Sequence, residues 1–102
     1  IKNTKYDREA YTVETDTLDH LLPETEPVTL IKMDIEGSEY QALLGASKLI
    51  QRYKPKLAIS IYHWGKDYFR LALLIKELVP EYKIAIRHHK KTTMGTNLYA
   101  WI

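Results

Sequence analysis

The stretch Ile31-Lys32-Met33-Asp34-Ile35-Glu36-Gly37-Ser38-Glu39 decides the fold. A short apolar run ends at Asp34, a second carboxylate follows at Glu36, and Gly37 precedes residues that can begin a helix. In α/β proteins a buried strand delivers acidic groups to its C-terminal end, a glycine turns the chain, and a helix packs back on the sheet. The stretch therefore predicts an α/β fold with a ligand site at this strand end.

The rest of the chain continues the same alternation of strand and helix. Five strands are expected, over residues 11–15, 28–33, 57–61, 82–88 and 97–102. Three helical segments are expected: residues 17–22 with Thr17 as the cap, a segment that opens at Ser38, and a segment from Asp67 to a stop at Pro80. The second has the capping-box form Ser38-x-x-Gln41 and is interrupted at Gly45, where glycine readily takes a left-handed conformation. The apolar run over 28–33 indicates burial on both faces, and the short link between the last two strands indicates an antiparallel hairpin. We expect a mostly parallel sheet that is closed by this hairpin.

Composition excludes several classes of protein. The chain has 102 residues, which suits one small domain, and 45% of them are hydrophobic. No apolar run approaches the roughly 20 residues of a membrane span. Cysteine is absent, which fits a cytoplasmic protein, and the net charge of +2 is too small to indicate a nucleic-acid partner. Residues 1–10 are polar and unpatterned, so we expect a disordered or loosely attached lead-in before a domain over 11–102.

Four side chains could carry chemistry at the strand ends. Asp34 could hold a cationic group or accept a proton, although a carboxylate near a helix start is also simply stabilising. Glu36 could join it, whereas Glu39 falls in a first helical turn, where a structural role is the stronger interpretation. His63 follows the 57–61 strand and has the acid–base range of a general base. If these two strands are parallel neighbours, His63 should lie near Asp34.

Two further groups are open to either interpretation. The basic run His88-His89-Lys90-Lys91 could bind an anion, although most such runs are only solvated. Several aromatic residues could form a wall for a sugar or a base, although core packing explains them equally well. They are Tyr62, Trp64, Tyr68 and Tyr99.

The combination of motifs resembles the FkbM-type methyltransferase family. The matching stretches are Thr17-Leu18-Asp19-x-Leu21-Leu22, Ile31-Lys32-x-Asp34-x-Glu36-Gly37-x-Glu39, Leu43-Leu44-Gly45-Ala46, Lys54-Pro55-Lys56-Leu57 and Ile61-Tyr62-His63. The likeness covers roughly residues 11–102, in the same order as in the family. It implies a Rossmann-like fold, S-adenosylmethionine as the cofactor, and methylation of a hydroxyl on a sugar or other small molecule.

The resemblance also implies roles for individual residues. Asp34 would lie beside the donor or the acceptor hydroxyl, with Glu36 and His63 in the same pocket. Asp34 and His63 would be catalytic, and Asp34 and Glu36 would contact the cofactor. The glycine-rich donor loop of such enzymes is absent, so the chain resembles the C-terminal half of one. The strand that ends at Asp34 should then expose an edge for self-association.

Two other functions stay open from the residues. Asp34, Glu36, Glu39 and His63 could bind a divalent metal for hydrolytic chemistry. The chain could also be a non-catalytic α/β association module.

Overall fold

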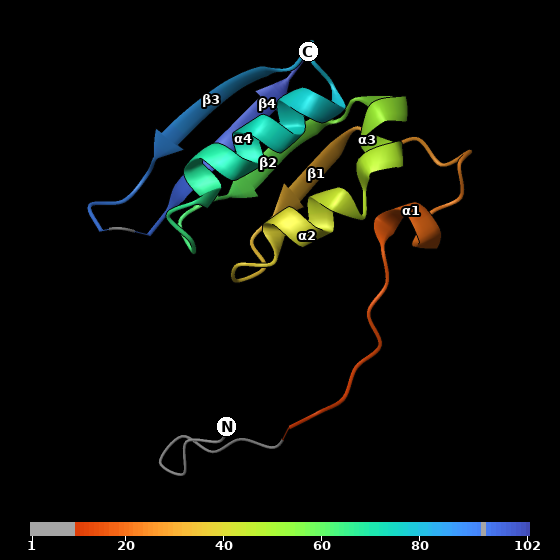
Figure 1. Ribbon diagram of the computed structural model, residues 1–102, viewed down its shortest axis with the longest axis horizontal. Coiled ribbons are helices and arrows are strands. Elements are labelled where there is room, and N and C mark those ends of the chain that lie inside the picture. The colour runs from red at the N-terminus through yellow and green to blue at the C-terminus, as the bar shows by residue number, and fades with distance from the viewer. Residues whose placement is uncertain (1–9, 93) are drawn as a thin grey trace.

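The computed structural model describes residues 10–92 and 94–102. The helices of this part are α1 (Leu18–Leu21), α2 (Glu39–Leu44), α3 (Ser47–Tyr53) and α4 (Asp67–Leu78). The strands are β1 (Leu30–Met33), β2 (Lys56–Ser60), β3 (Lys83–His88) and β4 (Thr96–Trp101) (Figure 1).

The four strands of the described part form one mixed sheet in the order β1-β2-β4-β3. β1 and β2 are parallel, with Met33 opposite Ile59, and β4 runs antiparallel to both of its neighbours. The predicted closing hairpin is therefore confirmed. The prediction of a mostly parallel sheet is wrong for this part of the chain, because β4 inserts between β2 and β3 and makes two of the three pairings antiparallel.

The predicted first strand, residues 11–15, does not form. The segment lies in no strand of the described chain, and Tyr11 and Val13 are 78% and 74% exposed. Figure 1 shows it running away from the sheet. Alternating side chains favour a strand only where a neighbouring strand accepts the backbone hydrogen bonds. The expected lead-in, residues 1–10, lies outside the described residues except for Ala10, and it stays a prediction.

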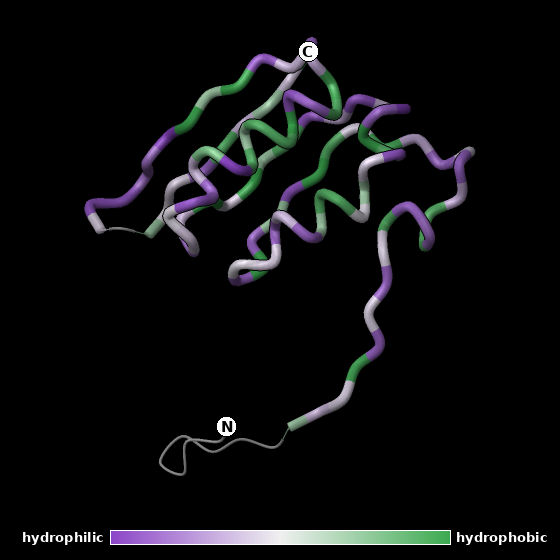
Figure 2. Tube along the Cα trace, in the orientation of Figure 1, coloured by the Kyte–Doolittle hydropathy of each residue, from purple (hydrophilic) through white to green (hydrophobic). Residues whose placement is uncertain are grey.

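The helices α2, α3 and α4 lie on one side of the sheet (Figure 1). Strand residues that face these helices are buried. Along β1, however, exposed and buried positions alternate, so the prediction that this strand is buried on both faces is wrong. Lys32 lies on the uncovered face, which explains a charge within an apolar run. Figure 2 shows the apolar residues concentrated in the strands and in stripes along the helices. The buried hydrophobic residues are Ile31, Met33, Leu43, Ala46, Leu49, Ile50, Leu57, Ile59, Ile61, Leu71, Leu74, Ile75, Val79, Tyr82, Leu98 and Ala100.

The short helix α1 supports the turn between α2 and α3. Thr17 caps α1 as predicted, because its hydroxyl accepts a hydrogen bond from the amide of His20 at 3.1 Å. Asp19 then caps α3, since its carboxylate accepts hydrogen bonds from the backbone amides of Lys48 and Leu49 at 3.0 and 2.9 Å.

Gly45 separates α2 from α3 as predicted, but its predicted left-handed conformation is wrong. Its φ of −73° and ψ of −5° lie in the right-handed region. A glycine suits the position for reasons of space, because a Cβ there would approach Thr17 Cγ2 to 2.9 Å. The close approach of α1 explains the residue better than backbone freedom does.

None of the helices in residues 10–92 and 94–102 combines the length and the apolar character that a membrane span needs.

Candidate active site

The loop after β1 is built around the carboxylate of Glu39. This side chain is fully buried at the start of α2. It accepts hydrogen bonds from the backbone amide of Ile35 at 2.7 Å and from that of Gly37 at 3.0 Å. These two hydrogen bonds fold the chain back on itself, with φ of +57° at Glu36 and +101° at Gly37. A positive φ is uncommon for glutamate, and here it directs the side chain of Glu36 over the strand end.

Gly37 is required by space as well as by conformation. The indole Nε1 of Trp64 donates a hydrogen bond to the carbonyl of Gly37 at 2.9 Å. A Cβ at Gly37 would approach the same indole nitrogen to 2.5 Å, which is closer than real side chains come. The loop after β1 and the loop after β2 are thereby locked together.

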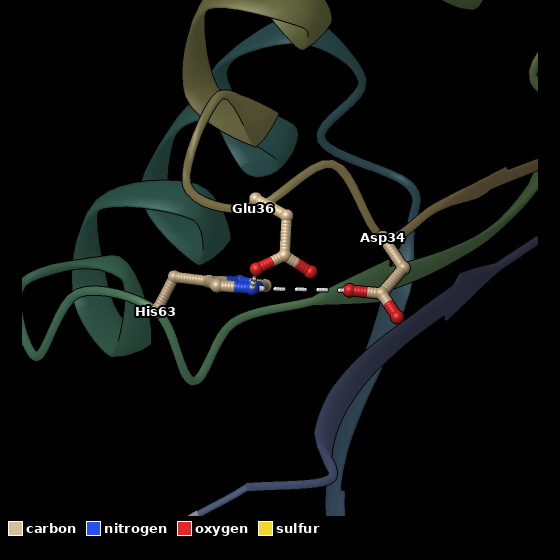
Figure 3. Close-up of side chains that lie close together, drawn as sticks. All are labelled: Asp34, Glu36 and His63. Atoms are coloured by element: carbon tan, nitrogen blue, oxygen red, sulfur yellow. Dashed lines mark ion pairs between the residues drawn. The ribbon is translucent and has the colours of Figure 1, made fainter. Parts of the chain in front are cut away.

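His63 lies at the centre of three carboxylates. Its Nε2 is 3.2 Å from Glu36 Oε2 and 3.9 Å from Asp34 Oδ1, and its Nδ1 is 3.8 Å from Glu39 Oε2. The first two contacts are shown in Figure 3. The His63 side chain is 12% exposed, while those of Asp34 and Glu36 are 52% and 82% exposed. Within the described residues, both ring nitrogens are buried and lack an aligned hydrogen bond. The imidazole therefore lies within 4 Å of three carboxylates, which form ion pairs with it only when it is protonated, and it has no aligned hydrogen-bond partner among the described residues.

Tyr62 covers the outer side of this histidine. The two rings stack with their centroids 4.1 Å apart. Partial desolvation raises the pKa of the Tyr62 phenol, and the nearby carboxylates of Asp34, Glu36 and Glu39 raise it further. The phenol therefore stays protonated near neutral pH and can donate a hydrogen bond to a ligand.

The structure brings together the three residues that the sequence predicted for the site. Asp34 and His63 are neighbours because β1 and β2 are parallel and adjacent, as expected, and Glu36 Oε2 lies 3.2 Å from the same His63 nitrogen. Sequence reasoning underestimated Glu39, which it assigned to an ordinary first helical turn. The predicted capping box from Ser38 to Gln41 is wrong, because the Ser38 side chain makes no cap hydrogen bond. The one sequence signal for the structural role of Glu39 was Gly37, because a glycine turn leaves backbone amides that can donate hydrogen bonds to a nearby carboxylate.

The same cluster could hold a cation. Asp34, Glu36 and His63 each offer one ligand atom, and these atoms lie within 4.8 Å of one another. Metal–ligand distances of about 2.0–2.6 Å to oxygen and nitrogen would allow one divalent ion to reach all three. Alternatively, the cluster can bind a positively charged ligand or remove a proton from a hydroxyl.

Two comparisons place the chain among known proteins. The model of the methyltransferase FkbM domain matches residues 2–89. The crystal structure of the methyltransferase FkbM from Methylobacillus flagellatus is similar, with a TM-score of 0.75 and 44% sequence identity. The match covers 82% of this chain and 22% of that one, so the chain spans about a fifth of the length of that structure. No curated protein matches the chain.

Proposed function

Because the chain belongs to the methyltransferase FkbM family, we propose that Asp34 and His63 act in the active site of an S-adenosylmethionine-dependent methyltransferase. The observation that carries the proposal is the pairing of these two side chains at adjacent strand ends, with 3.9 Å between Asp34 Oδ1 and His63 Nε2. Ligands of open α/β sheets bind beyond the carboxyl ends of the strands, where both residues lie.

The acceptor hydroxyl would sit between the two side chains. A hydroxyl has a single proton, so it can donate a hydrogen bond to His63 Nε2 or to Asp34 Oδ1 but not to both. With the hydroxyl bound at His63 Nε2, His63 would accept the proton as the oxygen attacks the methyl group, and the Asp34 carboxylate, 3.9 Å from that nitrogen, would stabilise the imidazolium that forms. Glu36 covers His63 Nε2, but its side chain is 82% exposed and can move aside when the acceptor enters. Glu39 Oε2 lies 3.8 Å from Nδ1, and its negative charge would also favour the imidazolium.

The exposed carboxylates suit one part of the donor. When bound, S-adenosylmethionine supplies an electrophilic methyl group on a positively charged sulfur. Asp34 and Glu36 place negative charge at the sheet edge, where such a cation is favoured. The four glycines of the chain, residues 37, 45, 65 and 95, do not cluster as a donor-binding loop would. The residues present therefore fit the reacting end of the donor and not its nucleoside.

We propose that this region is the C-terminal, acceptor-side part of a Rossmann-like catalytic domain. The uncovered sheet face and the edge position of β1 support this, because both would accept further elements of such a domain. The same edge could pair with a second copy of the chain. Sedimentation velocity over a range of protein concentrations tests this, and a constant monomer would refute self-association.

The acceptor that we propose is a hydroxyl on a carbohydrate or other small molecule, with no nucleic acid or membrane involved. The family match disfavours the divalent-metal hydrolase that the carboxylates alone left open. A purely non-catalytic module would not explain why Asp34, Glu36 and His63 converge. The cytoplasmic location stays a prediction.

Substitution of the two catalytic residues tests the proposal. In the full-length protein, Asp34→Ala and His63→Ala should each lower methyl transfer at least a hundredfold without unfolding the protein. Glu77→Ala, at an exposed position on α4, is the control and should leave turnover unchanged. Near-normal turnover in both variants would overturn the site assignment.

A further inference from the structure

A hollow begins at Asp34 and extends over the uncovered face of the sheet to the β3–β4 turn. Its volume is about 400 Å³. Asp34 belongs both to this hollow and to the carboxylate cluster around His63. A molecule that presents a hydroxyl to Asp34 would therefore extend the rest of its body into the hollow.

The floor of the hollow follows from strand register. Ala58 on β2 lies opposite Lys32 on β1 and opposite Tyr99 on β4. A methyl group between two long side chains leaves a depression in the sheet surface, and all three residues line it. The depression has a cationic wall at Lys32 and an aromatic wall at Tyr99.

Lys90 supplies a second cation from the β3–β4 turn, which Figure 2 shows as a hydrophilic run. Its side chain packs against Gly95, where an added Cβ would approach Lys90 Cγ to 2.9 Å and where φ is +82°. Within the described residues, neither Lys32 nor Lys90 has a carboxylate partner, whereas Lys54 is paired with Glu81 at 2.6 Å. Two ammonium groups thus line the hollow without forming an ion pair, and Asp34 is the one carboxylate among the lining residues.

The wall formed by β4 offers neutral hydrogen-bonding groups. The Tyr99 hydroxyl lies 2.8 Å from His89 Nε2 and accepts a hydrogen bond from Asn97 Nδ2 at 3.3 Å. Ser60 donates to the Asn97 side chain at 3.3 Å. Such a chain of hydroxyl and amide groups suits a polyhydroxylated ligand, and the Tyr99 ring suits the apolar face of a sugar.

We infer that the hollow binds the acceptor through an anionic group, a carboxylate or a phosphate, held by Lys32 and Lys90. The acceptor hydroxyl would lie at Asp34, two residues beyond Lys32 along the chain. The charge pattern orients the molecule, because Asp34 repels the anionic group while both lysines attract it. The inference rests on the proposed function for the reaction, but the preference for an anion stands on the hollow alone.

Binding of matched sugars to the full-length protein tests the inference. Calorimetric titrations would compare glucose with glucuronate and with glucose 1-phosphate. Both anions should bind at least tenfold more tightly than glucose, and added salt should weaken the preference. The two titrations also show whether a carboxylate or a phosphate is preferred. Equal affinity for glucose and for the two anions would overturn the inference.

Lysine variants identify the site. Lys32→Gln and Lys90→Gln should each weaken anion binding about tenfold. Gly95→Ala should do the same by displacing Lys90. Lys91→Gln is the matched control, because Lys91 is exposed in the same turn but does not line the hollow. An equal loss in Lys91→Gln would show general attraction to the basic turn and refute the site.

The two proposals can fail separately. With an anionic acceptor, Lys32→Gln should raise KM and leave kcat nearly unchanged, because the lysine binds without touching the reacting atoms. Methyl transfer to neutral and anionic acceptors with equal efficiency would refute the inference and keep the proposed function. Selective anion binding without any binding of S-adenosylhomocysteine would refute the proposed function and keep the inference.

Discussion

At the residue scale, Glu39 holds the candidate site together. Asp34 and His63 stood out in the sequence because strand ends present functional groups, and their adjacency followed from a parallel pairing. Glu39 did not stand out, because its importance depends on burial and on two amides made available by the Glu36–Gly37 turn. Local sequence indicates which residue types are present, whereas tertiary contacts decide which carboxylate is structural.

Glu39→Gln should destabilise the protein by about 2–3 kcal/mol, because an amide nitrogen would replace one of two buried acceptor oxygens. Urea unfolding monitored by circular dichroism measures the change. Glu36→Gln is the matched control. Its side chain is 82% exposed, so the free energy of unfolding should change by less than about 0.5 kcal/mol. Equal effects of the two variants would contradict the structural role of Glu39.

Tyr82 should make stability depend on pH in the alkaline range. Its buried hydroxyl donates a hydrogen bond to the Pro55 carbonyl, and burial raises the pKa of Tyr82 to about 12. The unfolded chain releases this proton near pH 10. The stabilising contribution is therefore complete below about pH 10 and is lost as the pH rises toward 12.

The difference between wild type and Tyr82→Phe isolates this effect from the other groups that titrate there. Unfolding free energies between pH 8 and pH 11.5 should fall more steeply for wild type than for the variant. Parallel curves would show that Tyr82 does not carry the dependence.

At the element scale, the loop after β1 and the turn between α2 and α3 are held by contacts from distant segments. The sequence predicted that these helices would separate at Gly45 and that Thr17 would cap α1. It could not reveal that α1 packs on that turn, because 26 or more residues separate the contacting groups, such as the Asp19 amide and the Gly45 carbonyl. Strand 11–15 was mispredicted for the complementary reason, since an alternating pattern does not show whether a partner strand is present.

Gly37→Ala should destabilise the loop by about 2 kcal/mol or more, because φ is +101° and the new Cβ would collide with Trp64. Trp64 fluorescence and chemical unfolding both measure the effect. Gly65→Ala serves as the control, because a Cβ at Gly65 meets no atom within 4 Å. A neutral Gly37→Ala variant would refute the locked-loop description.

Asp19→Ala should cost about 1–2 kcal/mol, since it removes the acceptor of two amides at the start of α3. Thermal unfolding measures the loss. Lys48→Ala, on the exposed side of the same helix, keeps both amides and should be nearly neutral. If the two variants have equal effects, Asp19 does not cap α3.

At the scale of the whole molecule, the sheet is covered by helices on one face, and β1 lies at an edge. The α/β class and the closing hairpin were predictable from strand and helix periodicity. The mixed sheet was not, because strand order depends on where β4 inserts. The family followed from the Lys32-to-Glu39 motif and is now supported by the family match and by the related crystal structure.

Donor binding tests the central claim most directly. Calorimetric titration of S-adenosylhomocysteine into the full-length protein should show saturable one-to-one binding, weakened at least tenfold by Asp34→Ala. Glu77→Ala should bind as wild type does. An absence of binding by the folded wild-type protein would contradict the methyltransferase assignment, and unchanged binding in Asp34→Ala would remove Asp34 from the donor site.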